Sequence, residues 1–135
     1  MSKTIQALKG VDSSTASKLK EAGCGTPAKL LEAGATKKGR KALAAQTGID
    51  ESEILKCVNM SDLFRIKGIA TQYAELLEAA GVDTVKELRN RKPENLTAKM
   101  KETNEKEEHC RQAPGLALVQ SWVEQAKTLD PVVKY

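Results

Sequence analysis

The chain has 135 residues and a mass of 14.6 kDa, the length of one compact domain or of two very small units sharing a core. With 40% hydrophobic and 30% charged residues and a formal net charge of +4, it is weakly basic and too apolar for a disordered chain. No run of 18 apolar residues and no apolar signal segment occurs, so we expect a cytoplasmic protein that does not enter a membrane.

The first predicted elements lie in residues 8–30, and their pattern returns 58 places later in residues 66–88. The two stretches read "LKGVDSSTASKLKEAGCGTPAKL" and "IKGIATQYAELLEAAGVDTVKEL", and they align without a gap. Internal repetition of this kind indicates duplicated structural units. We therefore expect one compact domain of two pseudo-repeats, about 1–60 and about 61–129.

Each copy has the pattern of helix, hairpin, helix, turn and helix. Ser or Thr is expected to cap the helix starts, and Gly is expected to end the helices because it accepts a left-handed backbone. These caps and stops fall at aligned positions: Ser13 and Thr71, Gly23 and Gly81, Thr26 and Thr84.

Further helices are predicted between and after the copies. Thr36 should cap a helix that Gly48 ends, and residues 93–109 and 114–129 read as a charged helix and an amphipathic one. With no sustained two-residue alternation and only 3% aromatic residues, we expect an all-α fold of eight to ten short helices. The expected core consists of apolar residues at helical spacing: Leu8, Leu19, Leu30, Leu43, Ile54, Val58, Ile66, Leu77, Leu88, Leu118 and Trp122.

Positive charge is concentrated in the first half of the chain. Residues 1–60 hold ten Lys/Arg against six Asp/Glu, whereas residues 61–135 hold twelve of each. A basic region can indicate electrostatic binding to nucleic acid, and the alternative is a solvated face that favours solubility. The densest basic stretch consists of Lys37, Lys38, Arg40 and Lys41.

The segments "LKGVDSSTASKLKEAG" and "IKGIATQYAELLEAAG" resemble the helix-hairpin-helix motif. The layout from about residue 5 to 129 also looks like a small uncharacterised family built from two such units. The resemblance implies sequence-independent contact with the DNA backbone, in which hairpin amides and a helix N-terminus face a phosphate. It places the donors and neighbouring lysines at Lys9, Gly10, Val11 and Ser13, and at Lys67, Gly68, Ile69 and Thr71, with support from Lys37 to Lys41.

Both copies depart from the motif at its second glycine, which is Asp12 in the first and Ala70 in the second. A carboxylate repels a phosphate, so the second hairpin is the better expected site. The alternative, from another class of function, is a protein-interaction or assembly module in which the hairpins only pack helices.

A second pattern, "LAAQTGIDESEI", has helix-turn-helix spacing. Its second helix starts with Asp50, Glu51, Ser52 and Glu53, and three carboxylates disfavour an approach to DNA, so a packing corner is expected.

The sequence lacks the signals of an enzyme or a metal site. The three cysteines form no CxxC pair, and His109 and Cys110 are adjacent, which is a poor arrangement for a base and its nucleophile. We expect a non-enzymatic protein without metal or cofactor, whose partner is DNA or another protein.

Overall fold

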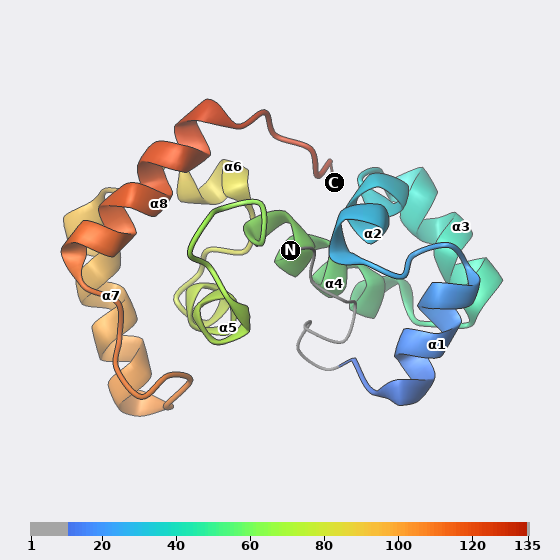
Figure 1. Cartoon of the computed structure of the whole chain (residues 1–135), viewed down its shortest axis with the longest axis horizontal. Helices are drawn as coiled ribbons and strands as arrows, with labels where there is room; N and C mark the ends of the chain where they lie inside the picture. The colour runs from blue at the N-terminus through green and yellow to red at the C-terminus, as the bar shows by residue number, and fades with distance from the viewer. Residues whose placement is uncertain (1–10, 135) are drawn as a thin grey trace. The chain divides into compact units, whose positions relative to one another are not determined.

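The computed structural model describes residues 11–134, and this part of the chain is all-α, as predicted. Its helices are separated by turns and loops, with no strand in residues 11–134 (Figure 1). In chain order they are α1 (Ser13–Glu21), α2 (Pro27–Gly34), α3 (Lys37–Thr47), α4 (Glu51–Leu63), α5 (Thr71–Ala79), α6 (Val85–Leu88), α7 (Pro93–Lys106) and α8 (Leu116–Thr128).

The chain divides into two compact units. Among the described residues, unit 1 comprises 11–62 and 132–134 and so contains α1 to α3 and nearly all of α4. Unit 2, Leu63–Pro131, contains α5 to α8. The chain thus returns to unit 1 after it has completed unit 2.

Unit 1 is held by close packing between its helices. α2 packs against α3, and Leu30, Leu43 and Ile54 are buried as predicted. A Cβ added at Gly34 would lie 2.6 Å from Cγ2 of the fully buried Val58, so α2 approaches α4 at a distance that only glycine allows.

Unit 2 is built around α8, which packs against α6 and α7, while α7 also packs against α5. Trp122 on α8 is fully buried and meets the ring of Tyr73 at a centroid distance of 5.1 Å. Leu118 is half-exposed, so its predicted place in the core was wrong, because α8 turns its Val119, Val123 and Ala126 side inward. Of the other predicted core residues, Leu8 lies outside the described residues and the rest are buried.

The predicted helix starts are correct in part. Thr26, Thr36 and Thr84 each cap a helix through the side-chain oxygen. Ser13 and Thr71 are already the first helical residues, so their predicted capping role was wrong. The extended backbone before them places the N-cap at Asp12 in unit 1 and at Ala70 in unit 2. The predicted stops Gly23, Gly48 and Gly81 all have positive φ.

The first and the last helices of the two units correspond in length, whereas α2 and α6 have 8 and 4 residues and α3 and α7 have 11 and 14. α1 and α5 each have 9 residues and begin 58 positions apart, at Ser13 and Thr71. α4 and α8 each have 13 residues and begin 65 positions apart, at Glu51 and Leu116. α2 and α6 also begin 58 positions apart, at Pro27 and Val85, so the seven additional residues lie between the starts of α6 and α8.

Replacing Gly39 with alanine should destabilise the protein. A Cβ at this position in α3 would lie only 2.2 Å from the Ala33 carbonyl oxygen, which belongs to the backbone of α2 and cannot move alone. We expect a net loss of about 1–2 kcal/mol, since overpacking outweighs the helix propensity gained from alanine. Urea denaturation followed by far-UV circular dichroism measures the change. Gly25→Ala is the control, because its Cβ would meet only Lys20 Cγ at 3.7 Å; equal effects of the two substitutions would contradict the steric argument.

Candidate nucleic-acid interface

The second hairpin, residues 66–70, is stabilised by hydrogen bonds to its own unit. The Lys67 amide donates to Gln125 Oε1 at 2.8 Å, and Gln125 Nε2 donates to the Lys67 carbonyl at 3.1 Å. The Ile69 amide donates to the Ile66 carbonyl at 3.3 Å. The Ile69 amide, which was predicted to face phosphate, is therefore used within the fold, and so is the amide of Lys67. The Lys67 side chain remains exposed beside them.

Gly68, at the tip of this hairpin, has a φ of +99°, and its position requires glycine for two reasons. An L side chain is strained at this φ, and a Cβ would lie 3.2 Å from Nε1 of the buried Trp122. Trp122 Nε1 itself has no hydrogen-bond partner within residues 11–134. Hairpin and α8 are thus in direct contact, with Gly68 exposed on the outer side.

The two helices that follow the hairpins differ at their N-termini. In α1 the Asp12 carboxylate accepts a hydrogen bond from the Thr15 amide at 2.8 Å, and this bond holds the pKa of Asp12 below its usual value. In α5 the N-cap is Ala70, which has no side chain that can cap the helix. The start of α1 therefore already carries a negative charge from its N-cap. The start of α5 is likewise the positive end of a helix dipole, but its N-cap contributes no negative charge. Thr71, the first residue of α5, is half-exposed.

The first predicted hairpin can be followed only in part. Lys9 and Gly10 lie outside the described residues. Val11 is half-buried, and Ser13 is the exposed first residue of α1.

The basic stretch of α3 is divided between surface and interior. Lys37, Lys38 and Lys41 are exposed. Arg40 is only 2% exposed, and its guanidinium donates to the carbonyls of Gly34 at 2.8 Å and Lys134 at 2.7 Å. The expectation that Arg40 presents its charge to a phosphate therefore does not agree with the structure, in which the side chain binds backbone.

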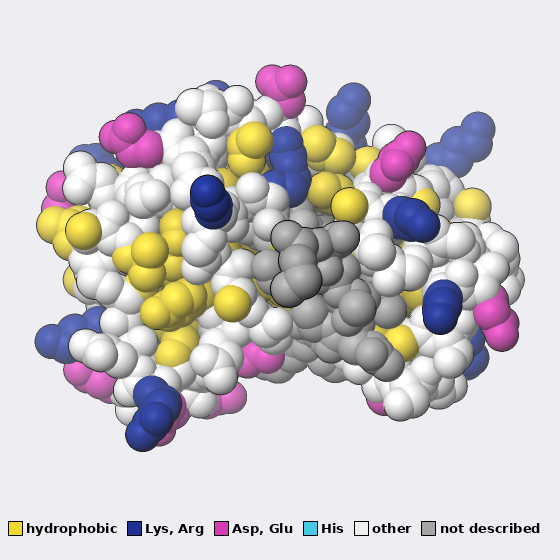
Figure 2. All heavy atoms as spheres, in the orientation of Figure 1, with side chains coloured by type: hydrophobic (Ala, Val, Ile, Leu, Met, Phe, Trp, Pro, Cys, Tyr) yellow, Lys and Arg dark blue, Asp and Glu magenta, His cyan; other side chains and the backbone are white. Residues whose placement is uncertain are grey.

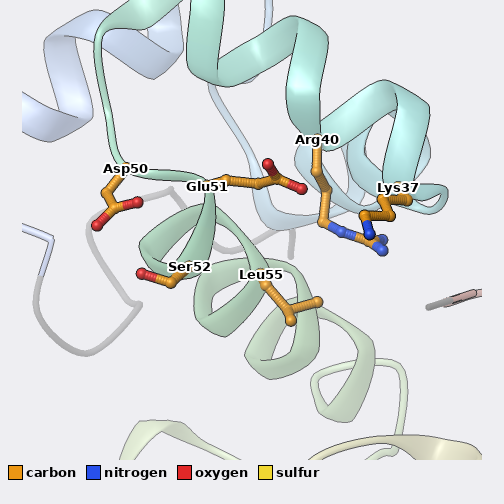
Figure 3. A pocket seen from close by; sticks show the side chains of 6 residues that line it. All are labelled: Lys37, Arg40, Asp50, Glu51, Ser52 and Leu55. Atoms are coloured by element: carbon orange, nitrogen blue, oxygen red, sulfur yellow. The ribbon is translucent and has the colours of Figure 1, made fainter.

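A shallow pocket of about 450 Å³ opens between α3 and the start of α4. In Figure 3, Lys37 and Arg40 extend from α3 toward α4, and the Glu51 carboxylate extends toward them. Because the pocket combines cations with carboxylates, it does not present charge of a single sign to a ligand. Its lining residues are Lys37, Arg40, Asp50, Glu51, Ser52 and Leu55.

The cysteines and the histidine lie in environments typical of structural residues and not of a reactive or metal-binding site. Burial raises the pKa of Cys24, and burial followed by Glu75 and Glu108 raises that of Cys110, so both thiols stay protonated. The Cys110 thiol lies 3.8 Å from the Gln72 carbonyl, and His109 Nδ1 lies 3.8 Å from a Glu75 oxygen. No three His, Cys, Asp or Glu side chains of the described part of the chain are placed to hold a metal ion.

The sequence reasoning missed a group of cations in unit 2. Lys86 and Lys92 are exposed and Arg89 is half-exposed, on α6 and the loop that follows it. We call these three residues the α6 corner. In the sequence this group is visible as the segment "KELRNRK", which has four cations and one carboxylate. It was overlooked because residues 61–135 as a whole contain equal numbers of acidic and basic residues.

Within each unit, on the face drawn in Figure 2, Lys and Arg side chains stand apart from one another, and Asp and Glu side chains lie among them. Contacts with a polyanion on this face would therefore be local and few.

Comparison with known protein families identifies the family of the chain. A family model described as a domain of unknown function, DUF4332, matches residues 9–129. No curated protein and no solved structure matches the chain. Among the helices of residues 11–134, none combines the length and the apolar composition needed to cross a bilayer.

Proposed function

Because this chain belongs to the DUF4332 family, whose function is unknown, we propose a function from its own residues: a non-enzymatic module that binds the DNA backbone weakly and without sequence preference. Its main site is the second hairpin, with its helix-hairpin-helix character and the exposed Lys67. The exposed Lys37, Lys38 and Lys41 of α3 add sequence-independent phosphate contacts.

The observation that carries this proposal is the contrast between the two aligned helix starts. The Asp12 carboxylate occupies the place at the start of α1 where an anion would bind. At the start of α5, Ala70 has no side chain that reaches the corresponding place. An anion at the α5 terminus would gain from the helix dipole and from the adjacent Lys67. The bonds from Lys67 and Ile69 amides within the fold reduce the number of free donors, so the affinity should be low.

A protein-interaction module is the second candidate function, and one feature of unit 2 favours it. Leu116 at the start of α8 is 43% exposed, and Leu118 is half-exposed. Leu118 Cδ1 would lie 3.8 Å from a Cβ at Gly68, so apolar surface adjoins the hairpin. Hydrophobic side chains also gather in Figure 2 in the region of unit 2 that Figure 1 shows between α7 and α5, below α8.

The proposal predicts that Lys67→Ala weakens DNA binding and lowers its salt dependence. Removing one phosphate contact should reduce the slope of log K against log salt by about one, equally for unrelated DNA sequences. Fluorescence anisotropy with duplex, junction and single-stranded DNA at about 50 and about 200 mM salt measures the slope.

Lys101→Ala is the matched control, since Lys101 is also an exposed lysine of unit 2 but lies on α7. Its slope should equal that of the unmodified protein. Gly68 is unsuitable as a test position, because any side chain there strains the backbone and meets Trp122. If the unmodified protein binds no DNA at the lower salt, the DNA proposal is wrong. The next experiment is then a search for a protein partner, in which Leu116→Glu is the variant expected to lose binding.

A further inference from the structure

The charged side chains around α6 are not equivalent. Arg91 binds Glu87 twice, with Nη2 at 2.9 Å and Nε at 3.2 Å from Oε1, and Nη2 also donates to the Gly81 carbonyl at 3.1 Å. Glu87 is the one carboxylate among residues 86–92, and its charge is thereby neutralised locally. Arg91 in turn fixes the loop after α6 to the turn before it.

The other three cations of this segment form the α6 corner and have no ion pair within the described residues. Lys86 and Arg89 are three residues apart, and Arg89 keeps helical angles as the C-cap of α6, so both side chains leave the same face. The Asn90 side chain donates to the Lys86 carbonyl at 3.0 Å and closes the end of the helix. Lys92 follows as the N-cap of α7.

Charge also differs between the segment before α7 and the end of α7. Residues 86–92 hold four Lys/Arg and one Glu, whereas residues 102–108 hold four Glu and one Lys. α7 has 14 residues, which corresponds to a length of about 21 Å. This distance exceeds the Debye length of about 8 Å at physiological salt, so the carboxylates at the end of α7 do not cancel the cations before its start.

From these observations we infer that the α6 corner is a second contact of the protein with duplex DNA, in which Lys86, Arg89 and Lys92 bind backbone phosphates. This inference rests on the DNA binding proposed above and adds a surface to it. The partner is a polyanion because three cations without an ion pair in the described residues lie within seven positions, on α6 and the loop after it. The carboxylates at the end of α7 would repel the same strand, so the contact is confined to the α6 corner. No base-specific contact is implied, since lysine and arginine on phosphate carry no sequence information.

The test is the salt dependence of duplex binding by the triple variant K86A/R89A/K92A. Loss of three phosphate contacts should lower the slope of log K against log salt by about two to three. The matched control is K18A/K20A/K29A, which removes the same charge from three exposed lysines of unit 1 and should leave the slope unchanged. Thermal unfolding followed by circular dichroism establishes that both variants fold. If the triple variant does not fold, K86Q/K92Q replaces it, with an expected decrease of about two.

The outcomes separate the two proposals. A slope that falls for the α6 corner variant and not for the control supports the inference. Equal slopes for both triple variants, while Lys67→Ala still lowers the slope, overturn the α6 corner and leave the hairpin site intact. Absence of any DNA binding by the unmodified protein overturns the proposed function and the α6 corner with it.

Discussion

Replacing Trp122 with alanine should lower the free energy of unfolding by about 3–5 kcal/mol, the largest effect we expect from a single substitution. The indole is fully buried, packs against Tyr73 and supports the hairpin at Gly68. Alanine would leave a cavity at the junction of α8 with the hairpin, which surrounding helices can fill only in part. Because Trp122 is the only tryptophan, urea denaturation must be followed by far-UV circular dichroism rather than by fluorescence.

Trp122→Phe is the matched control for this effect. Phenylalanine keeps most of the buried ring and removes Nε1, a buried donor without a partner in residues 11–134. Since an unsatisfied donor costs about 1–3 kcal/mol, its removal should offset the smaller ring, and we expect a net loss below about 1 kcal/mol. A loss as large as that of the alanine variant would show that Nε1 has a partner in solution.

Replacing Arg40 with alanine should cost about 2–4 kcal/mol of stability, because two carbonyls inside unit 1 lose their donor. The guanidinium donates hydrogen bonds to the Gly34 and Lys134 carbonyls through two different nitrogens. Lysine has one ammonium and cannot reproduce this geometry, so Arg40→Lys should lose roughly half of the same stability. Thermal and urea unfolding of the two variants measure both losses.

DNA binding provides an independent test of Arg40. Since its charge is buried and bound to backbone, the salt slope of folded Arg40→Lys should equal that of the unmodified protein. A changed slope with unchanged stability would mean that Arg40 contacts phosphate and would contradict its structural role.

The fold class and most helix bounds followed from local signals. Thr26, Thr36 and Thr84 cap helices because a threonine before a helical pattern can accept an amide whatever its tertiary surroundings. The N-caps of α1 and α5 were misplaced by one residue, because adjacent residues such as Asp12 and Ser13 are both good caps. The backbone angles that choose between them depend on the preceding turn, which the sequence does not specify.

The candidate site could be predicted less well, because the missing information is non-local. Arg40 and its exposed neighbours form one basic run in the sequence, yet the partner that keeps Arg40 inside lies 94 residues away at Lys134. The hydrogen bonds between Lys67 and Gln125, which are 58 residues apart, could not be predicted from the sequence either. Leu118 fits the amphipathic pattern of α8, but burial depends on which neighbours cover that edge of the helix.

The pairing of Lys134 with Ala35 and Arg40 also has a consequence for how the protein is made. Unit 1 uses residues on both sides of unit 2, so a ribosome must synthesise all of unit 2 before the carbonyl of Lys134 exists. At about 5–20 residues per second, the roughly 70 intervening residues take about 4–14 s. During that interval the guanidinium of Arg40 lacks the Lys134 carbonyl as an acceptor. Unit 1 therefore completes its hydrogen bonds last, although most of its sequence is translated first.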